Sequence, residues 1–565
     1  MKVAMLYDDD AYVEQPDRRR KQKKENQGLW GRHVAGREFL DAYLTHGTWR
    51  ELAALVRSRG SKKSLVQFCK DHPSSTTQSR RLRIFQERNF LEEFCLDPPA
   101  PVLYTPQPPD ERYAWARQHA AGGRFAICGL THTLCSARAN RLLLSLMTAP
   151  FEEHDALICT SRSVISMVTA LLDNYGDYLK ERFGGSPRIK PRLELIPLGV
   201  NTDKFRPASP EEKATERAAF EIHEDEVAVL FVGRFAAHGK AHPFPIYHGL
   251  QRAAERTKKK IHLLLSGWAS SEGILQAFID GAQAFAPDVR LTIVDGTKSA
   301  ARFGVWKAAD IFTSLSDNIQ ETFGLVIVEA MASGLPVVAS DWNGYRDLVV
   351  DRETGYLVPT IMVPGATQDT TANLLFGAVD YDRFIGACNQ TTIVDNGAAA
   401  DAFTSLVQDA TLRAQFGAAG RRRAEEQFAW PHIIKAYEEL WRSQAAAIQN
   451  GGGSVPRAST PAAYPPPESC FHSYPTHWLD AGDQLVASAD IDHLQVTLDL
   501  ALTNYGGSGR VTDRQTLREI IELAQTPREL SELAGVLAAD EKAQQKVMAT
   551  IGWMLKYGLL QWVRA

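Results

Sequence analysis

The stretch Ser316–Asp351, SDNIQETFGLVIVEAMASGLPVVASDWNGYRDLVVD, decides the fold because it predicts a loop, a helix and a strand in direct succession. The apolar run Ile311–Leu315 precedes it and is typical of a buried parallel strand. Gly334 and Pro336 indicate that the helix stops before a second strand begins at Val337. The stretch therefore predicts a strand, loop, helix, strand unit, as found in α/β folds.

Two glutamates, Glu321 and Glu329, lie around the predicted start of this helix. If the helix begins near Phe323 or Gly324, its free N–H groups can stabilise a phosphate, and the glycine lets that phosphate approach closely. At a rise of roughly 1.5 Å per residue, the two carboxylates can address groups about one diphosphate apart. Solvated helix glutamates are the alternative, and the apolar neighbours of Glu329 disfavour it. The stretch thus predicts a nucleotide diphosphate site.

The spacing of Glu321, seven residues and Glu329 within ETFGLVIVEAMASGLPVVAS resembles the signature of the retaining nucleotide-sugar glycosyltransferases of family GT4. The resemblance implies the GT-B fold, an α/β architecture in which two Rossmann-like doubly wound domains face a cleft. It implies that Glu321 is catalytic at the transferred sugar and that Glu329 binds the ribose hydroxyls. It also implies donor-binding backbone amides at Thr322, Phe323 and Gly324, with no bound metal and no cofactor beyond the nucleotide diphosphate sugar as co-substrate.

Two segments of the N-terminal half fit this family. A strand at Lys2–Tyr7 is followed by a glycine loop and a helix in QGLWGRHVAGREFLDAYL, which makes Gly31 a candidate donor contact. A strand at Phe125–Leu130 delivers His132 to the carboxyl end of the sheet, where open α/β sheets bind ligands. The resemblance implies a catalytic contact between His132 and the donor sugar. From the residues alone, an ordinary tight turn and a loop-capping histidine remain the alternatives.

Two cations follow the first predicted strand of the second domain. Val227–Gly233 predicts that strand, Arg234 stands at its end, and Lys240 follows six residues later. A guanidinium fork and an ammonium point charge both suit a diphosphate, although surface solvation is the alternative. GT4 members usually space these cations five residues apart, so RFAAHGK departs from the pattern. A further strand, Ala156–Cys159, leads to Thr160-Ser161-Arg162, for which we expect a structural role.

The resemblance covers roughly residues 1–447 and predicts three parts. They are an N-terminal Rossmann-like acceptor-side domain at 1–200, a C-terminal Rossmann-like nucleotide-sugar domain at 201–430, and a crossover helix at 431–447. The segments NGGGS and PRASTPAAYPPP then predict a flexible linker at 448–467.

Residues 468–565 predict a small, mainly α, winged-helix-like domain. Amphipathic segments at Thr516–Leu523 and Val547–Leu555, a capping box at Thr526–Glu529 that opens a helix, and a strand in KYGLLQWV support it. The segment has 13 acidic residues against 8 Lys or Arg, the wrong sign for a phosphate-backbone partner. We therefore expect a protein partner or a structural appendage, and we do not expect nucleic acid.

The composition bounds the remaining classes. The 565 residues are 44% apolar and 23% charged with a net charge of −4, which is typical of a globular protein with several domains. No run of 18 apolar residues and no signal peptide are evident, so we expect a cytoplasmic protein. The basic run Arg18–Glu25, with its cations at 18–24, is expected to be a solvated loop or to grip an anionic acceptor or the inner face of a membrane.

The cysteines and one acidic cluster are the remaining candidates for cross-links or metal ligands. The seven cysteines are scattered without a CxxC pair, which favours reduced thiols over zinc or disulfides. Asp8, Asp9 and Asp10 form an acidic cluster at the end of the first strand, but no other ligand stands at a recognisable spacing, so metal binding is not expected.

The sequence thus predicts a glycosyltransferase that moves a sugar from a nucleotide diphosphate sugar to a hydroxyl acceptor, such as a glycan, a glycolipid or a small metabolite. Polysaccharide biosynthesis is one setting consistent with it. Two alternatives remain open. One is a catalytically silent GT-B protein that binds nucleotides and acts through its C-terminal interaction module. The other is a different GT-B enzyme, such as a sugar-nucleotide epimerase.

Overall fold

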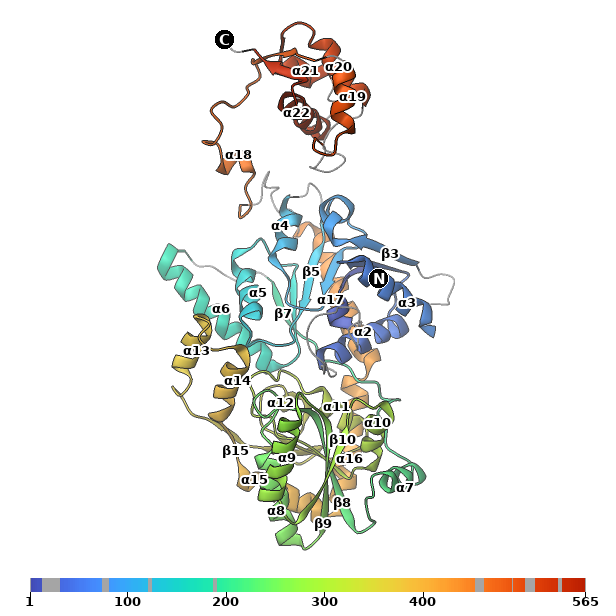
Figure 1. The fold of residues 1–565 in the computed structure, drawn as a ribbon. Coiled ribbons are helices and arrows are strands. Elements are labelled where there is room, and N and C mark those ends of the chain that lie inside the picture. The colour runs from blue at the N-terminus through green and yellow to red at the C-terminus, as the bar shows by residue number, and fades with distance from the viewer. Residues whose placement is uncertain are drawn as a thin grey trace. The chain divides into compact units, whose positions relative to one another are not determined.

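The computed structural model describes residues 2–12, 31–73, 81–119, 124–185, 191–452, 462–489, 491–503, 514–536 and 541–563. Two compact units make up the chain, Met1–Pro461 and Ala462–Ala565. The first unit contains two parallel sheets with helices packed around them (Figure 1).

The first sheet has seven parallel strands in the order β3-β2-β1-β4-β5-β6-β7. Its strands are β1 (Lys2–Tyr7), β2 (Glu51–Val56), β3 (Arg81–Gln86), β4 (Val102–Thr105), β5 (Ala126–Leu130), β6 (Ala156–Cys159) and β7 (Arg192–Leu195). The accompanying helices are α1 (Asp9–Tyr12), α2 (Gly31–His46), α3 (Arg59–Asp71), α4 (Glu111–His119), α5 (Ala137–Thr148) and α6 (Arg162–Phe183).

The second sheet has six parallel strands in the order β10-β9-β8-β11-β12-β13. Its strands are β8 (Glu226–Phe235), β9 (Lys260–Ala269), β10 (Val289–Asp295), β11 (Ile311–Ser314), β12 (Val337–Ser340) and β13 (Gly355–Val358). The helices are α7 (Pro210–Ala219), α8 (Phe244–Thr257), α9 (Glu272–Phe285), α10 (Ser299–Ala308), α11 (Leu325–Ala332), α12 (Tyr345–Leu348), α15 (Asn396–Gln408) and α16 (Ala410–Arg423).

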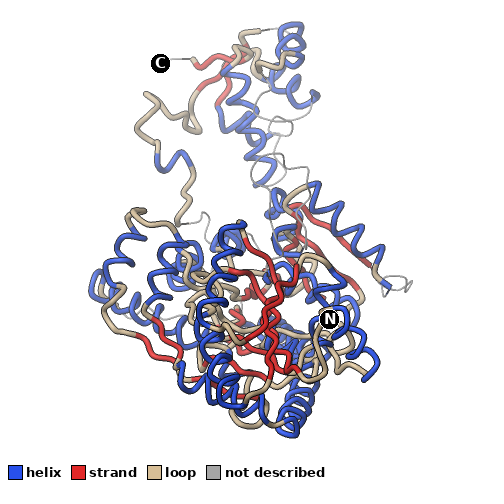
Figure 2. The backbone as a smooth tube through the Cα atoms, turned by 60° about the horizontal axis from the view of Figure 1, so that its bottom comes forward, coloured by secondary structure: helices blue, strands red, loops and turns tan. Residues whose placement is uncertain are grey.

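Both sheets contain the doubly wound strand order 3-2-1-4-5-6. In this order the strands are added first on one side of the domain's first strand and then on its other side. The central strands are buried along their whole length, as the run AICGL of β5 illustrates. Such strands need helices on both faces, and Figure 2 shows helices around the strands of each sheet. The expectation of two Rossmann-like domains is confirmed.

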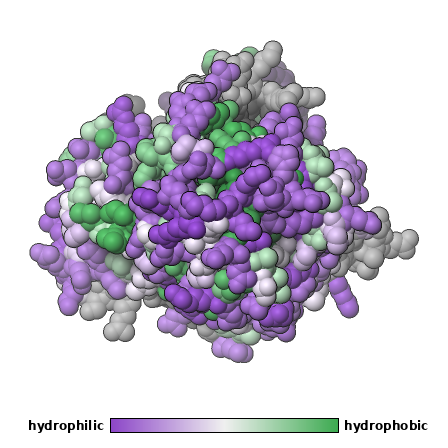
Figure 3. All heavy atoms as spheres, turned by 90° about the horizontal axis from the view of Figure 1, so that it is seen from below, coloured by the Kyte–Doolittle hydropathy of each residue, from purple (hydrophilic) through white to green (hydrophobic). Residues whose placement is uncertain are grey.

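A helical excursion separates β13 from α15. It consists of β14 (Thr360–Met362), α13 (Gln368–Leu375), α14 (Tyr381–Gln390) and β15 (Thr392–Val394), and β14 pairs with β15 in an antiparallel ribbon. The ribbon exposes Ile361 and Ile393, which are cross-strand partners. Figure 3 shows hydrophobic side chains on the side where Figure 1 draws α13 and β15.

Helix α17 (Trp430–Ala447) returns the chain to the first sheet. Its Tyr437 packs against Phe39 and Tyr104, with ring centroids 4.9 and 5.8 Å apart. Its Glu438 accepts hydrogen bonds from the backbone N–H and hydroxyl of Thr48 at 2.6 and 2.7 Å. Helix α17 therefore belongs to the apolar core of the first sheet.

The second unit joins a three-stranded antiparallel sheet to short helices. The sheet order is β17-β16-β18, with β16 (Gln484–Ala487), β17 (Arg528–Glu529) and β18 (Leu560–Trp562). The helices are α18 (Pro467–Cys470), α19 (Ile491–Asp499), α20 (Arg514–Leu523), α21 (Leu530–Val536) and α22 (Glu541–Lys556). A winged-helix relationship stays a prediction.

The predicted capping box at Thr526–Glu529 is wrong. Arg528 and Glu529 are extended and pair with Leu485 and Gln484 of β16, so α21 begins only at Leu530. A backbone that donates and accepts across a sheet cannot also form the first turn of a helix. Tertiary pairing therefore overrides the local capping signal.

All seven cysteines are free thiols. Among the described residues, no helix combines the length and the apolar character needed to cross a membrane.

Candidate active site

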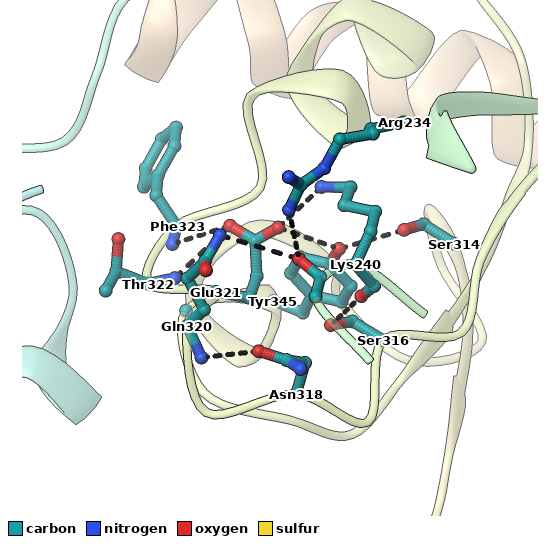
Figure 4. A network of polar contacts seen from close by, with 12 residues as sticks. Arg234, Lys240, Ser314, Ser316, Asn318, Gln320, Glu321, Thr322, Phe323 and Tyr345 are labelled. Atoms are coloured by element: carbon teal, nitrogen blue, oxygen red, sulfur yellow. Dashed lines mark hydrogen bonds and ion pairs between the residues drawn. The ribbon is translucent and has the colours of Figure 1, made fainter. Parts of the chain in front are cut away.

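Glu321 lies in the loop that joins β11 to α11, at the carboxyl end of the second sheet (Figure 4). Lys240 Nζ lies 2.6 Å from Glu321 Oε2. The backbone N–H groups of Thr322 and Phe323 point at Oε1 from 3.2 and 3.4 Å. Tyr345 donates its hydroxyl to Oε2 over 3.5 Å. The carboxylate is thus held by an ammonium and by two of the backbone amides predicted to bind the donor.

The ionisation of this pair follows from its surroundings. Burial raises the pKa of Glu321, but the Lys240 ammonium and the two amides outweigh it and hold the pKa below its usual value. Burial alone would lower the pKa of Lys240, but the charge of Glu321 outweighs burial, so the pKa of Lys240 is raised. Both groups therefore stay charged across the neutral range.

Arg234 lies next to the last residue of β8, and Lys240 ends the tight turn that follows this strand. The N–H groups of Gly239 and Lys240 donate to the carbonyl of Ala236 at 3.1 and 2.9 Å, which absorbs the extra residue of RFAAHGK. Arg234 Nη2 donates to the carbonyl of Gly239 at 3.4 Å. Ser316 fixes the other side of the turn by donating to the carbonyl of Lys240 at 3.0 Å. The wider spacing therefore still brings Lys240 to Glu321.

Gly324 is the N-cap of α11 and has a φ of +105°, a conformation that favours glycine. A Cβ at this position would lie 2.5 Å from Cε1 of Tyr345. The glycine is thus required by the backbone and by the tyrosine ring beneath it. Because α11 begins at Leu325, Glu329 lies in the second turn, somewhat nearer the helix start than the sequence indicated.

Glu329 is only 6% exposed. Burial, followed by the nearby charge of Glu38, raises its pKa to about 8, against the opposing charges of Arg302, Lys204 and Lys240. Lys240 thus acts on both glutamates of the pair. A carboxyl group in this state is suited to hydroxyl partners, such as those of a ribose, because hydrogen bonds offset the cost of its burial.

This raised pKa predicts a pH-dependent stability. Between about pH 4.5 and 8 the unfolded chain ionises Glu329 while the native chain keeps it protonated, so the free energy of unfolding falls as the pH rises. Glu329→Gln has no proton to lose. We therefore expect its melting temperature to rise relative to that of the parent between pH 5 and pH 8. Paired thermal melts measure this difference, and the buried Asp317, whose pKa burial also raises, contributes equally to both proteins. Parallel curves for the two proteins would contradict the prediction.

His132 and Ser161 bring the first domain to the Glu321 loop. The Thr322 hydroxyl donates to the carbonyl of His132 at 2.6 Å, and the Ser161 hydroxyl donates to the carbonyl of Thr322 at 2.9 Å. Ser161 also caps α6, and the N–H of Arg162 donates to Asp347 of the second domain at 2.6 Å. The structural role expected for Thr160-Ser161-Arg162 thus extends to the site itself.

His132 also lines a small pocket on the side of the first domain. The pocket is mostly aromatic and aliphatic, and its lining includes Tyr12, Phe39, Tyr104, Leu198 and Trp430. The histidine therefore stands between this pocket and the Glu321 loop.

The other predicted residues have varied positions. Gly31 is the first residue of α2, and its donor contact stays a prediction. Asp8 forms an ion pair with Arg57 at 2.5 Å, which is a structural role. The basic run 18–24, Gly28 and the side chains of Asp9 and Asp10 lie outside the described residues. Within the described part of the chain, no three His, Cys, Asp or Glu side chains gather as a metal site would require.

Several supporting residues were not anticipated. Trp342 Nε1 donates to the carbonyl of Asn318 at 3.0 Å, and Asn343 Nδ2 donates to the carbonyl of Glu321 at 2.8 Å. Asp317 precedes Asn318 and accepts from the N–H of His242 at 3.2 Å, and burial raises its pKa to about 7. The dipeptide Asn343-Gly344 is a turn signal that could have drawn attention to this segment. No local signal indicates which loop the turn supports.

The segment that carries this candidate site is similar to known proteins. Residues 226–375 match the family described as "Glycosyl transferases group 1". A D-inositol 3-phosphate glycosyltransferase from Mycobacteroides abscessus is 36% identical over 171 residues, which are 30% of this chain and 36% of that protein. One from Rhodococcus erythropolis is 26% identical over 332 residues, 57% of this chain and 63% of that protein.

A third relative is an alpha-maltose-1-phosphate synthase from Mycolicibacterium smegmatis, 28% identical over 267 residues, which are 46% of this chain and 59% of that protein. This chain thus spans less than two thirds of the length of these relatives. Among solved structures, Anabaena Alr3699/HepE in complex with UDP has a TM-score of 0.50 at 15% identity and covers 78% of this chain and 100% of its own. Residues 226–375 therefore match a glycosyl transferases group 1 domain, and the chain has the GT-B fold.

Proposed function

We propose that the protein is a glycosyltransferase that moves a sugar from a nucleotide diphosphate sugar to a hydroxyl acceptor. One observation carries the proposal. The Glu321 carboxylate, the Lys240 ammonium and the backbone amides of Thr322 and Phe323, which precede α11, converge on one point. A carboxylate for hydroxyls, together with a cation and the nearby start of a helix for phosphates, can bind a sugar bonded to a diphosphate. The family match to this segment supports the same conclusion.

The leaving group decides how the cations act. As the bond between sugar and diphosphate breaks, negative charge develops on the diphosphate, and Arg234, Lys240 and the start of α11 stabilise it. Lys240 and the amides keep the Glu321 carboxylate in place, and its remaining lone pairs accept hydrogen bonds from hydroxyls of the sugar. Catalysis is then mostly electrostatic, and no nucleophile on the protein is required.

The two glutamates and His132 together orient the donor. Glu329 accepts hydrogen bonds from the ribose hydroxyls, and Glu321 and His132 orient the transferred sugar. The contacts of Thr322 with His132 and Ser161 draw the first domain onto the donor loop, which excludes water that would otherwise hydrolyse the donor. The acceptor hydroxyl approaches from the first domain.

Retention of configuration and independence from metal are finer parts of the same proposal. Front-face attack, with the leaving phosphate accepting the acceptor proton, accounts for retention without a protein nucleophile. Proton NMR of the product taken before anomeric exchange reports its configuration. An excess of EDTA is expected to leave the rate unchanged.

The decisive experiment is release of the nucleotide diphosphate from a panel of UDP, GDP and ADP sugars, with sugars, inositol phosphate and simple alcohols as acceptors. We expect one donor to be turned over, and Arg234→Ala to lose at least tenfold in rate because one cation that stabilises the leaving group is missing. Arg256→Ala, an exposed arginine of the same domain, is the control. No turnover of any donor, together with unimpaired nucleotide binding, would favour the catalytically silent alternative.

A further inference from the structure

Helix α14 lies at the boundary between the two domains, beyond residues 226–375 that match the family (Figure 1). Its first residue, Tyr381, contacts both domains with one hydroxyl. The hydroxyl lies 3.0 Å from Sγ of Cys135, in the loop after β5 of the first domain. It also donates to Oε1 of Gln320 at 3.1 Å, the residue before Glu321. The Tyr381 side chain therefore connects the loop after β5, which carries His132 and Cys135, with the Glu321 loop.

The connection continues from Gln320 to the cations of the site. Gln320 Nε2 donates to the carbonyl of Gly239 at 3.5 Å, the same oxygen that accepts from Arg234. The N–H of Gln320 donates to Oδ1 of Asn318 at 2.8 Å. The position of Gln320 is thus coupled to the turn that carries Arg234 and to the backbone of Glu321.

The surroundings make these hydrogen bonds effective. Phe384, Ile385 and Cys388 of α14 form a buried apolar cluster that Cys135 and Tyr381 join. Burial raises the pKa of Cys135 and of Tyr381, so both keep their protons in the neutral range. The thiol can then donate to the tyrosine oxygen while the tyrosine donates to Gln320. A polar relay enclosed by apolar side chains is sensitive to the loss of any member.

We propose that Tyr381 is a positioning residue, which ties closure of the first domain at Cys135 to the placement of Gln320 and hence of Glu321 and Arg234. The inference rests on the proposed function. It assigns a role to the excursion between β13 and α15, whose α14 contacts the segment before Glu321 through Tyr381 and Asn389. The hydroxyl does not touch the reacting atoms and acts through Gln320.

The test is a double-mutant cycle of Tyr381→Phe and Cys135→Ala. Each single variant is expected to lower kcat about tenfold, the size of one lost buried hydrogen bond, with the Kd of the nucleotide changed less than threefold. The double variant should be no worse than either single one, because both remove the same relay. Cys135→Ser keeps a donor and is expected to retain the parental kcat. Tyr178→Phe, at an exposed tyrosine of α6, is the control.

Hydrogen exchange gives a readout that does not depend on turnover. With saturating nucleotide, amides 315–324 are expected to exchange about tenfold faster in Tyr381→Phe and Cys135→Ala than in the parent and in Cys135→Ser. Unchanged exchange and unchanged kcat, or kcat losses that multiply in the double variant, would overturn the positioning role. A parent that binds nucleotide without turnover would instead contradict the proposed function, and the exchange rates would still decide the role of Tyr381.

Discussion

Replacement of Glu321 by alanine is expected to lower the rate of sugar transfer by about 100- to 1000-fold, the loss typical of removing one preorganised electrostatic group from an active site. The carboxylate accepts from Lys240, Thr322 and Phe323, so its position is fixed before a donor arrives. Preorganisation of this kind acts on the transition state more than on binding. We therefore expect kcat to fall far more than the affinity for the nucleotide. Initial rates of nucleotide release at saturating donor measure the effect.

The controls separate chemistry from folding. Glu321→Gln keeps the shape of the side chain and an acceptor oxygen for Lys240, so it should still fold, though less stably than the parent because the ammonium loses its counter-charge, and it should transfer sugar as poorly as Glu321→Ala. Glu224→Ala, at an exposed residue of the same domain, should leave the rate unchanged. An active Glu321→Gln variant would show that the charge of this group is dispensable, and the catalytic assignment would fail.

Lys240→Met is expected to destabilise the protein by about 3 kcal/mol, because it leaves the Glu321 carboxylate without its cation. Both side chains are largely buried, with exposed fractions of 20% and 16%. Without the ammonium, burial raises the pKa of Glu321, so the loss should grow as the pH rises and ionises the carboxyl group. Urea denaturation at pH 5 and pH 8 measures both effects.

The double variant Lys240→Met with Glu321→Gln provides the matched control. It removes both charges, so the free energy of unfolding should recover much of the loss seen with Lys240→Met alone. A single variant as stable as the parent at pH 8 would mean that the 2.6 Å contact contributes nothing and that solvent replaces the ammonium.

The Glu321 loop, between β11 and α11, could be predicted from sequence because the residues that determine it are neighbours in the chain. The apolar run of β11, the glycine at 324 and the stop at Gly334 are all set by neighbours within a few residues. Glu329 was informative for the same reason, since its apolar surroundings lie in its own helix. Arg234 and Lys240 were found from their place at a strand end, even with an unusual spacing.

The supports of that loop could not be predicted because they are long-range contacts. Asn343 reaches the carbonyl of Glu321 from a turn 22 residues away, and Tyr381 joins residues from two domains. Nothing near these residues specifies their partners. At Arg528 and Glu529 the local sequence predicted the start of a helix, but these residues instead pair with β16. Local patterns thus indicated the candidate site, and tertiary contacts decide how its residues are held.

The central claim is that the Glu321 loop binds a nucleotide diphosphate, and calorimetric titration of UDP, GDP and ADP into the purified protein tests it most directly. We predict one nucleotide that binds at a single site, that weakens at least tenfold in Arg234→Ala and Glu329→Ala, and that binds Arg256→Ala as it binds the parent. Failure of all three nucleotides to bind, or equal binding to the Arg234 and Glu329 variants, would contradict the account.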